Sequence, residues 1–273
     1  MVRKRISSAE NQFVKQAVEA KARKRGTKDF FIAEGPHLVD MAIESSAQIE
    51  EIFFTEDYIR TTEGKKIFDR LSDMETMPRF LIEVPSNIFA KISDTETPQG
   101  IVAVVVQPLT ALFGLTVSSN PLIVVCDGVG DPGNLGTIIR VADAVAADAV
   151  VVLPGTCDPF SPKTVRATAG SIFNIPVISS DRSGLIEYMA YGKIDLIATD
   201  INGKHSLFAC DFRRSIAFAF GNEAKGISRE LSDRASDSVR IPLPGKAESL
   251  NVAVSAAVCL YEVVRQRTLQ INS

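Results

Sequence analysis

Residues 239–258 read V-R-I-P-L-P-G-K-A-E-S-L-N-V-A-V-S-A-A-V, and this stretch decides how the rest of the chain is interpreted. Its first three residues are β-like, and the prolines that follow cannot donate to a sheet ladder, so the strand must end there. Ser249 is a good helix N-cap, and apolar residues occupy nearly the whole circumference over 252–264, which predicts a largely buried helix. The loop with Ser249 and Asn251 therefore lies at the carboxyl end of a sheet, where ligands bind. An ordinary strand-to-helix turn is the plainer alternative.

The region around this stretch is typical of an open α/β sheet. Residues 122–127 are almost wholly apolar, as expected of a strand buried on both faces of a parallel sheet. Strands that alternate with helices predict an open, mostly parallel sheet. The expected strands are 122–127, 149–153, 177–180, 196–199, 216–220 and 239–241, with helices at 135–146, 182–190 and 229–235.

The first hundred residues also alternate helix and strand and predict a separate αβ domain over residues 1–106. Residues 107–121 contain two prolines, a glycine and two serines without a sustained period, so they predict a linker. The second domain then covers 122–273. In the first domain the expected helices are 11–25, 37–45, 63–74 and 86–92, and the expected strands are 30–34, 49–55, 80–84 and 100–106.

The composition is that of an ordinary globular protein, with 273 residues, 45% hydrophobic and 23% charged. No run is long enough to cross a bilayer, and the first residues lack the apolar core of a secretory signal. We therefore expect a cytoplasmic protein without a membrane partner. The four cysteines form no C-x-x-C pair, and there are only two histidines. We expect buried thiols and no metal.

Basic side chains concentrate at the amino-terminal end. The net charge is −3, but residues 1–30 carry nine basic and three acidic side chains, a local charge of +6. This asymmetry favours contacts with nucleic-acid phosphates, although a solvated helix face looks similar. Two further cations follow the second expected strand of the second domain. The candidate RNA-binding residues are Arg3, Lys4, Arg5, Arg23, Lys24, Arg25, Lys163 and Arg166.

Residues 128–133 read G-V-G-D-P-G and match the dinucleotide-binding pattern G-x-G-x-x-G between a strand and a helix. That fold also needs an acidic residue at the end of its second strand, and here residues 153–156 read L-P-G-T. The fingerprint is incomplete. A nicotinamide or flavin oxidoreductase is therefore kept as a distant alternative.

Three loops of the second domain together resemble one family. Residues 134–140 read N-L-G-T-I-I-R, residues 221–226 read G-N-E-A-K-G, and I-P-L-P at 241–244 precedes E-S-L-N-V at 248–252. In this order and at these separations they resemble the motifs of the SpoU (TrmH-type) RNA ribose 2′-O-methyltransferases. Residues 10–106, with E-G-P and T-P-Q-G, resemble the substrate-binding domain that often precedes it.

The resemblance implies a carboxyl-terminal trefoil knot, which departs from the rule that chains do not thread themselves. It also implies a homodimer with active sites near the interface. S-adenosylmethionine would be held mainly by backbone of the second and third motifs. Carried onto this sequence, the cofactor-binding residues are Thr199, Gly221, Ile241 and Leu250, and the catalytic residues are Asn134, Arg140, Glu223, Ser249 and Asn251.

The family assigns Arg140 as the base, but a guanidinium stays protonated over the accessible pH range, so Arg140 is equally suited to gripping an RNA phosphate and stabilising an alkoxide. At helical geometry, six residues separate it from Asn134 by about 9 Å and about 240°. The two side chains cannot easily line one small pocket from one helix face, so Arg140 is either a surface charge unrelated to the site or part of a wall that another chain completes. We expect ribosomal RNA as the substrate, with transfer RNA and a non-catalytic RNA-binding role as alternatives.

Overall fold

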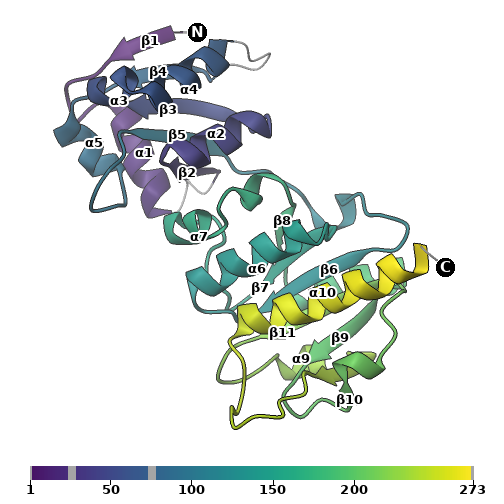
Figure 1. Ribbon diagram of the computed structural model, residues 1–273. Coiled ribbons are helices and arrows are strands. Elements are labelled where there is room, and N and C mark those ends of the chain that lie inside the picture. Colours follow the sequence, from purple (N-terminus) through teal and green to yellow (C-terminus); the bar gives the residue numbers. More distant parts are fainter. Residues whose placement is uncertain (1, 24–28, 73–77, 272–273) are drawn as a thin grey trace. The chain divides into compact units, whose positions relative to one another are not determined.

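The computed structural model describes residues 2–23, 29–72 and 78–271, and the chain forms two compact units (Figure 1). The first unit contains residues 1–109 together with 160–173, and the second contains 110–159 and 174–273. Both are α/β, as the sequence predicts. In the described part of the chain, no helix is long and apolar enough to span a bilayer.

The first unit is built on a five-stranded sheet in the order β1-β4-β3-β5-β2, in which β5 runs antiparallel to the other four strands. Helices α1 and α5 pack on one face, and α2, α4 and α7 pack on the other. The elements are β1 (Val2–Arg5), α1 (Gln12–Ala22), β2 (Phe30–Glu34), α2 (Pro36–Glu44), β3 (Ile49–Phe54), α3 (Glu56–Arg60), α4 (Thr62–Ser72), β4 (Phe80–Glu83), α5 (Ser86–Ile92), β5 (Ile101–Val106), α7 (Pro162–Ala167) and η2 (Ser171–Phe173).

The segment 160–173 differs from the expected domain division, which placed it in the second domain. In the structure it packs within the first unit, because the ring of Phe31 lies 5.1 Å from that of Phe160 and 5.9 Å from that of Phe173. Arg166 adds a hydrogen-bonded ion pair to Asp94, at 2.8 Å. Apolar and ionic contacts together hold this crossover on the first sheet.

The second unit contains a seven-stranded, fully parallel sheet in the order β10-β12-β9-β11-β6-β7-β8, which confirms the predicted parallel sheet. Its elements are η1 (Leu112–Gly114), β6 (Leu122–Asp127), α6 (Pro132–Ala144), β7 (Ala149–Leu153), β8 (Val177–Ser179), α8 (Arg182–Gly192), β9 (Asp195–Thr199), β10 (His205–Ser206), η3 (Leu207–Ala209), β11 (Ile216–Gly221), α9 (Arg229–Ser232), β12 (Asp237–Arg240) and α10 (Val252–Ile271).

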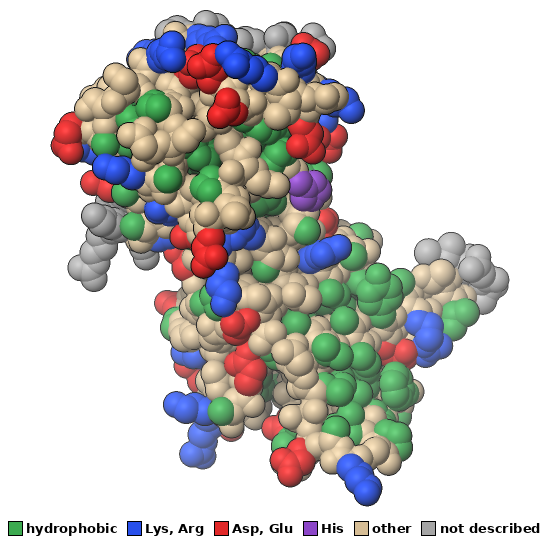
Figure 2. Space-filling model, turned by 60° about the vertical axis from the view of Figure 1, so that its left-hand side comes forward, with side chains coloured by type: hydrophobic (Ala, Val, Ile, Leu, Met, Phe, Trp, Pro, Cys, Tyr) green, Lys and Arg blue, Asp and Glu red, His purple; other side chains and the backbone are tan. Residues whose placement is uncertain are grey.

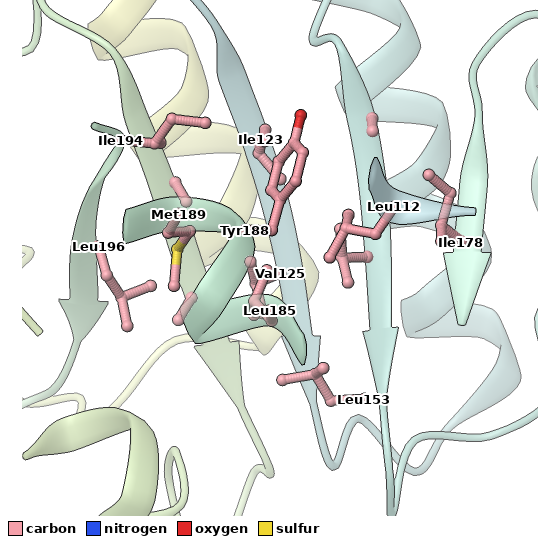
Figure 3. Packing of buried hydrophobic residues seen from close by; sticks show 14 of the residues in the cluster. Leu112, Ile123, Val125, Leu153, Ile178, Leu185, Tyr188, Met189, Ile194 and Leu196 are labelled. Atoms are coloured by element: carbon pink, nitrogen blue, oxygen red, sulfur yellow. The ribbon is translucent and has the colours of Figure 1, made fainter. Parts of the chain in front are cut away.

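Helices cover this sheet on both faces. Figure 3 shows Leu185, Tyr188 and Met189 of α8 packed over Ile123 and Val125 of β6. Alternate residues of the same strands point the other way, toward α6 and α10, which lie next to each other (Figure 1). The central strands β6, β7 and β11 are therefore buried on both sides, as their nearly continuous apolar sequences predict.

Helix α10 is less buried than the sequence predicts. Ala256 and Leu260 are fully buried, but Val254 and Tyr261 are 48% and 55% exposed. Apolar residues occupy nearly the whole circumference, yet α10 contacts the unit through one side only. The other side presents an apolar surface.

A buried carboxyl group lies inside the first sheet. Glu51 of β3 is 1% exposed, lies between Phe80 of β4 and Val104 of β5, and its Oε2 has no hydrogen-bond partner among the described residues. Burial raises the pKa of Glu51 to about 7, and the neighbouring Glu50 adds to this rise. The folded state therefore binds more protons than the unfolded state between about pH 4.5 and pH 7.

This difference predicts that stability falls as pH rises through that window. Glu51→Gln removes the buried charge, so we expect the variant to be more stable than the wild type by about 2 kcal/mol at pH 8 and nearly equal to it at pH 4. Thermal unfolding across this range measures the difference. Glu96→Gln, at an exposed position, is the control and should show no such trend. A Glu51→Gln variant that is less stable at pH 8 would contradict the prediction.

Candidate active site

A cavity of about 700 Å³ lies at the carboxyl ends of β9, β11 and β12. Parallel strands end at the same edge of a sheet, and ligands bind outside that edge in open α/β folds. The volume falls within the range of small-molecule sites. All four residues predicted to bind a cofactor line the cavity, namely Thr199, Gly221, Ile241 and Leu250.

Backbone contacts shape the wall formed by the end of β11. Asn222 and Gly226 exchange two backbone hydrogen bonds of 2.9 and 2.8 Å, which close the turn that carries Glu223. A Cβ on Gly221 would lie 2.1 Å from the carbonyl carbon of Gly226, so only glycine fits there. Thr199 ties β9 to β11, because its hydroxyl donates to the Ala219 carbonyl at 2.7 Å.

Three of the predicted catalytic residues form one hydrogen-bonded chain beside the cavity. The Asn134 amide donates from Nδ2 to Glu223 Oε1 at 2.9 Å. Its Oδ1 accepts from Asn251 Nδ2, also at 2.9 Å. The three side chains come from the first turn of α6, the turn after β11 and the residue before α10. Each predicted motif thus contributes one member.

The amino-terminal end of α10 is capped by Asn251 and not by Ser249 as the sequence suggested. Asn251 directly precedes the first helical residue, so its Oδ1 reaches the N–H groups of Ala253 and Val254 at 2.9 and 3.3 Å. Ser249 is exposed and lines the cavity with Glu223. Its hydroxyl is therefore available to a ligand.

Arg140 lies apart from the other predicted catalytic residues. It projects from the exposed side of α6, does not line the cavity, and makes no hydrogen bond or ion pair with the described part of the chain. The angle expected between Asn134 and Arg140 on one helix accounts for this separation. Within one chain, the structure does not bring Arg140 to the site.

The basic residues of β1 are engaged with the first unit. Arg3 donates to Glu83 at 2.9 Å, and Arg5 lies 3.3 Å from the same carboxylate. The Lys4 ammonium sits 3.9 Å from the centre of the Phe80 ring. These contacts reduce the positive charge that β1 offers to a phosphate.

Two other candidate RNA-binding arginines have structural roles. Arg23 donates to the Phe30 carbonyl at 2.7 Å, and Arg166 pairs with Asp94. Lys163, in the first turn of α7, is exposed. Lys24 and Arg25 lie outside the described residues.

The G-x-G-x-x-G segment is not shaped for a dinucleotide. The Gly128 N–H donates to Thr156 Oγ1 at 2.8 Å, and the Gly128 carbonyl accepts from Asn222 Nδ2 at 3.0 Å. Asp131 caps α6 by accepting from the Asn134 N–H, so a carboxylate occupies the place where a pyrophosphate would bind. The motif serves the loop's own structure.

The cavity wall that follows β9 was not predicted from the sequence. Asp200, Ile201 and Asn202 line the cavity, and the Asn202 N–H donates to Asp200 Oδ1 at 2.7 Å. A polar turn ending in glycine directly after a strand of this sheet was the available signal.

Across the described ranges, no group of three or more His, Cys, Asp or Glu side chains could hold a metal ion.

Comparison with known proteins matches both parts of the chain. The SpoU rRNA Methylase family matches residues 121–261, and the MRM3-like substrate binding domain matches residues 11–103. The 23S rRNA (guanosine(2553)-2′-O)-methyltransferase RlmP of Bacillus subtilis is 35% identical over 95% of this chain and 99% of its own length.

Two solved structures share the fold. The SpoU methyltransferase AviRb from Streptomyces viridochromogenes, in complex with AdoMet, has a TM-score of 0.85 and 28% identity over 95% of this chain and 99% of that one. The AdoMet-bound rRNA methyltransferase from Sinorhizobium meliloti has a TM-score of 0.82 and 29% identity over 96% and 98%. Since the family match spans more than half of the sequence and the Bacillus relative nearly all of it, the chain belongs to the SpoU rRNA Methylase family.

Proposed function

We propose that this protein is an S-adenosylmethionine-dependent RNA 2′-O-ribose methyltransferase that acts on ribosomal RNA. The observation that carries the proposal is the Asn251–Asn134–Glu223 chain at the edge of a ligand-sized cavity. The relative from Bacillus and one from Streptomyces viridochromogenes are named as 23S rRNA 2′-O-methyltransferases. These RNA-modifying relatives also support the cytoplasmic location that we propose.

The cavity suits S-adenosylmethionine, which supplies an electrophilic methyl group when bound. The tight turn at Gly221 brings main chain directly to the cavity wall, where backbone N–H and C=O groups can recognise an adenine edge or a ribose. Ile241 and Leu250 add apolar surface. Thr199, whose hydroxyl is already bonded, contributes a fixed wall.

The protein's own residues then position the ribose and stabilise the negative charge that develops on its 2′-oxygen. Asn134 and Asn251 have fixed amide orientations, because each bonds to the other, and Ser249 offers an exposed hydroxyl at the cavity. Arg140 stays protonated, so we assign it to bind an RNA phosphate and to stabilise the negative charge that develops on the 2′-oxygen as this atom takes the methyl group and its proton passes to solvent water. Glu223 holds the Asn134 amide in place.

The direct test is incubation with methyl-labelled S-adenosylmethionine and unmodified ribosomal or transfer RNA. We expect label on a ribose of ribosomal RNA, with mapping of the labelled nucleotide as the readout. Label confined to transfer RNA would support the alternative substrate. RNA binding without transfer of label would contradict an enzymatic role.

Arg140→Ala should lower the rate of methyl transfer by about 100-fold or more, because it removes the cation that faces developing charge. S-adenosylmethionine binding, measured by calorimetry, should stay within a few-fold of wild type, since Arg140 does not line the cavity. Arg234→Ala, an exposed arginine of the same unit, is the matched control. Equal loss of binding and transfer would count against a catalytic role.

Gly221→Ala should abolish measurable S-adenosylmethionine binding, because the added Cβ collides with the backbone at Gly226 and displaces the cavity wall. Gly130→Ala is the matched control, since a Cβ at Gly130 meets no atom within 4 Å. The control should bind normally. Normal binding by Gly221→Ala would show that the cofactor lies elsewhere.

We also propose that the second unit is a trefoil knot and that residues 1–106 bind the RNA. Strand β12 lies between β9 and β10, yet α10, which follows it, packs on α6 and β11 across the sheet. A chain that returns in this way is what a threaded carboxyl terminus requires. The MRM3-like match over residues 11–103 supports the assignment of the first domain.

We propose a homodimer that forms through the exposed side of α10. Val254, Tyr261 and Leu269 are 48%, 55% and 58% exposed and lie about two turns apart on one side of the helix. Figure 2 shows hydrophobic side chains gathered on the second unit near the carboxyl-terminal end of the chain. α6, which carries the exposed Arg140, lies next to α10. A second chain at this face would supply Arg140 to the cavity of the first.

A mixed dimer distinguishes this arrangement from a site within one chain. Arg140→Ala and Asn134→Ala chains are each expected to be inactive as homodimers. Co-expressed with different tags, they should regain methyl transfer, because one of the two sites then has both residues. No regained activity in a purified mixed dimer would place Arg140 and Asn134 in the same chain's site.

Tyr261→Arg puts a charge on the exposed side of α10 that is proposed to form the dimer. This variant should give monomers in analytical ultracentrifugation.

A further inference from the structure

An ion pair behind the site links four segments of the second unit. The Asp127 side chain, at the end of β6, is 1% exposed, and its Oδ1 accepts from Nε and Nη2 of Arg182 at 3.0 and 2.6 Å. Arg182 also donates to the Pro154 carbonyl at 2.9 Å and to Ser228 Oγ at 2.9 Å. Asp127 Oδ2 accepts from the Ser228 N–H at 2.7 Å. None of these four residues lines the cavity.

These bonds hold one end of the turn that carries Glu223. The turn begins at Asn222, whose Nδ2 donates to the Gly128 carbonyl, and it runs on to Ser228, whose N–H donates to Asp127. Both ends of the turn are thus bonded to two consecutive residues at the end of β6. That same segment leads directly into α6 and Asn134.

The geometry points to Arg182 as a positioning residue for Glu223, acting through its ion pair with Asp127. A buried carboxylate needs a paired cation, and Arg182 supplies it with three donor contacts directed to different segments. Without Arg182, Asp127 has no cation to keep it facing Ser228. The turn is then no longer held at Ser228, so Glu223 can move relative to Asn134 and their hydrogen bond is weakened.

The inference rests on the proposed methyltransferase function and is tested in the same assay. Arg182→Gln should lower kcat by about 10- to 100-fold, because small displacements of positioning groups cost that much in rate. Glu223→Gln should also lower kcat. In the Glu223→Gln background, Arg182→Gln should cause less than a twofold further loss, since its effect passes through Glu223. A merely structural role would give effects that multiply.

A second variant removes the bonds of Ser228 to Asp127 and Arg182 and leaves the buried Asp127–Arg182 ion pair in place. Ser228 has φ −62°, which proline adopts, so Ser228→Pro removes the N–H that Asp127 accepts and the Oγ that Arg182 contacts. We expect a folded protein with kcat reduced at least tenfold. If Arg182→Gln fails to fold, this variant decides the question.

The matched control is Arg214→Gln. Arg214 pairs with Asp195 at 2.5 Å in the same unit, at the amino ends of β9 and β11, away from the cavity. It should keep wild-type kcat. Folded Arg182→Gln and Ser228→Pro variants with wild-type kcat, or multiplying effects in the Glu223→Gln background, would overturn the inference. A wild-type protein that transfers no methyl group to RNA would instead refute the proposed function.

Discussion

The Asn134 side chain connects three segments that are far apart in the sequence. It donates to Glu223 and accepts from Asn251, so its amide has one orientation only. Both bonds are exposed to solvent, so the geometry of the two bonds, and not burial, links the three side chains. Glu223 and Asn251 would otherwise be independent polar groups on separate loops. The candidate site exists as a unit because this one amide is bonded at both ends.

The parallel sheet is what allows this connection to form. Four of its strands, β6, β7, β9 and β11, are paired along buried, mainly apolar segments, and their carboxyl ends reach one edge together. Loops at such an edge vary without disturbing the scaffold, and they carry the polar groups. Here the loops are also tied to one another, through Asn222 and Gly128 and through Ser228 and Asp127. The polar side chains of the site therefore lie on loops, but these loops are held in place by the sheet and by bonds to one another.

Most of the fold follows from continuous apolar runs, which predict buried strands, and from the 3.6-residue period of the helices. The strands Leu122–Asp127 and Ala149–Leu153 end where their apolar runs end, and helix α5 matches its expected bounds. The short strand β10 was missed because two residues show no period, and β1 because V-R-K-R is mostly charged. Edge strands need less apolar sequence, since one side faces solvent.

The site residues were recognisable by motif, but their contacts were not. Sequence spacing cannot show that Asn251 would cap α10 in place of Ser249, because both are good capping residues and the choice depends on where the helix begins. Nor can it show that Arg3 and Arg166 would be paired with carboxylates, since their partners Glu83 and Asp94 lie about 70 to 80 residues away. Local composition overstates the charge that is free to meet RNA.

The position of Arg140 and the apolar side of α10 have one common cause. Helices α6 and α10 cover the same face of the sheet side by side, and a helix that packs on a sheet with one side must expose the other. On α6 the exposed side carries Arg140, and on α10 it carries Val254 and Tyr261. A surface that buries the apolar groups of α10 against a second chain also brings the exposed Arg140 guanidinium to that interface. In the proposed dimer, association and completion of the site are therefore the same event.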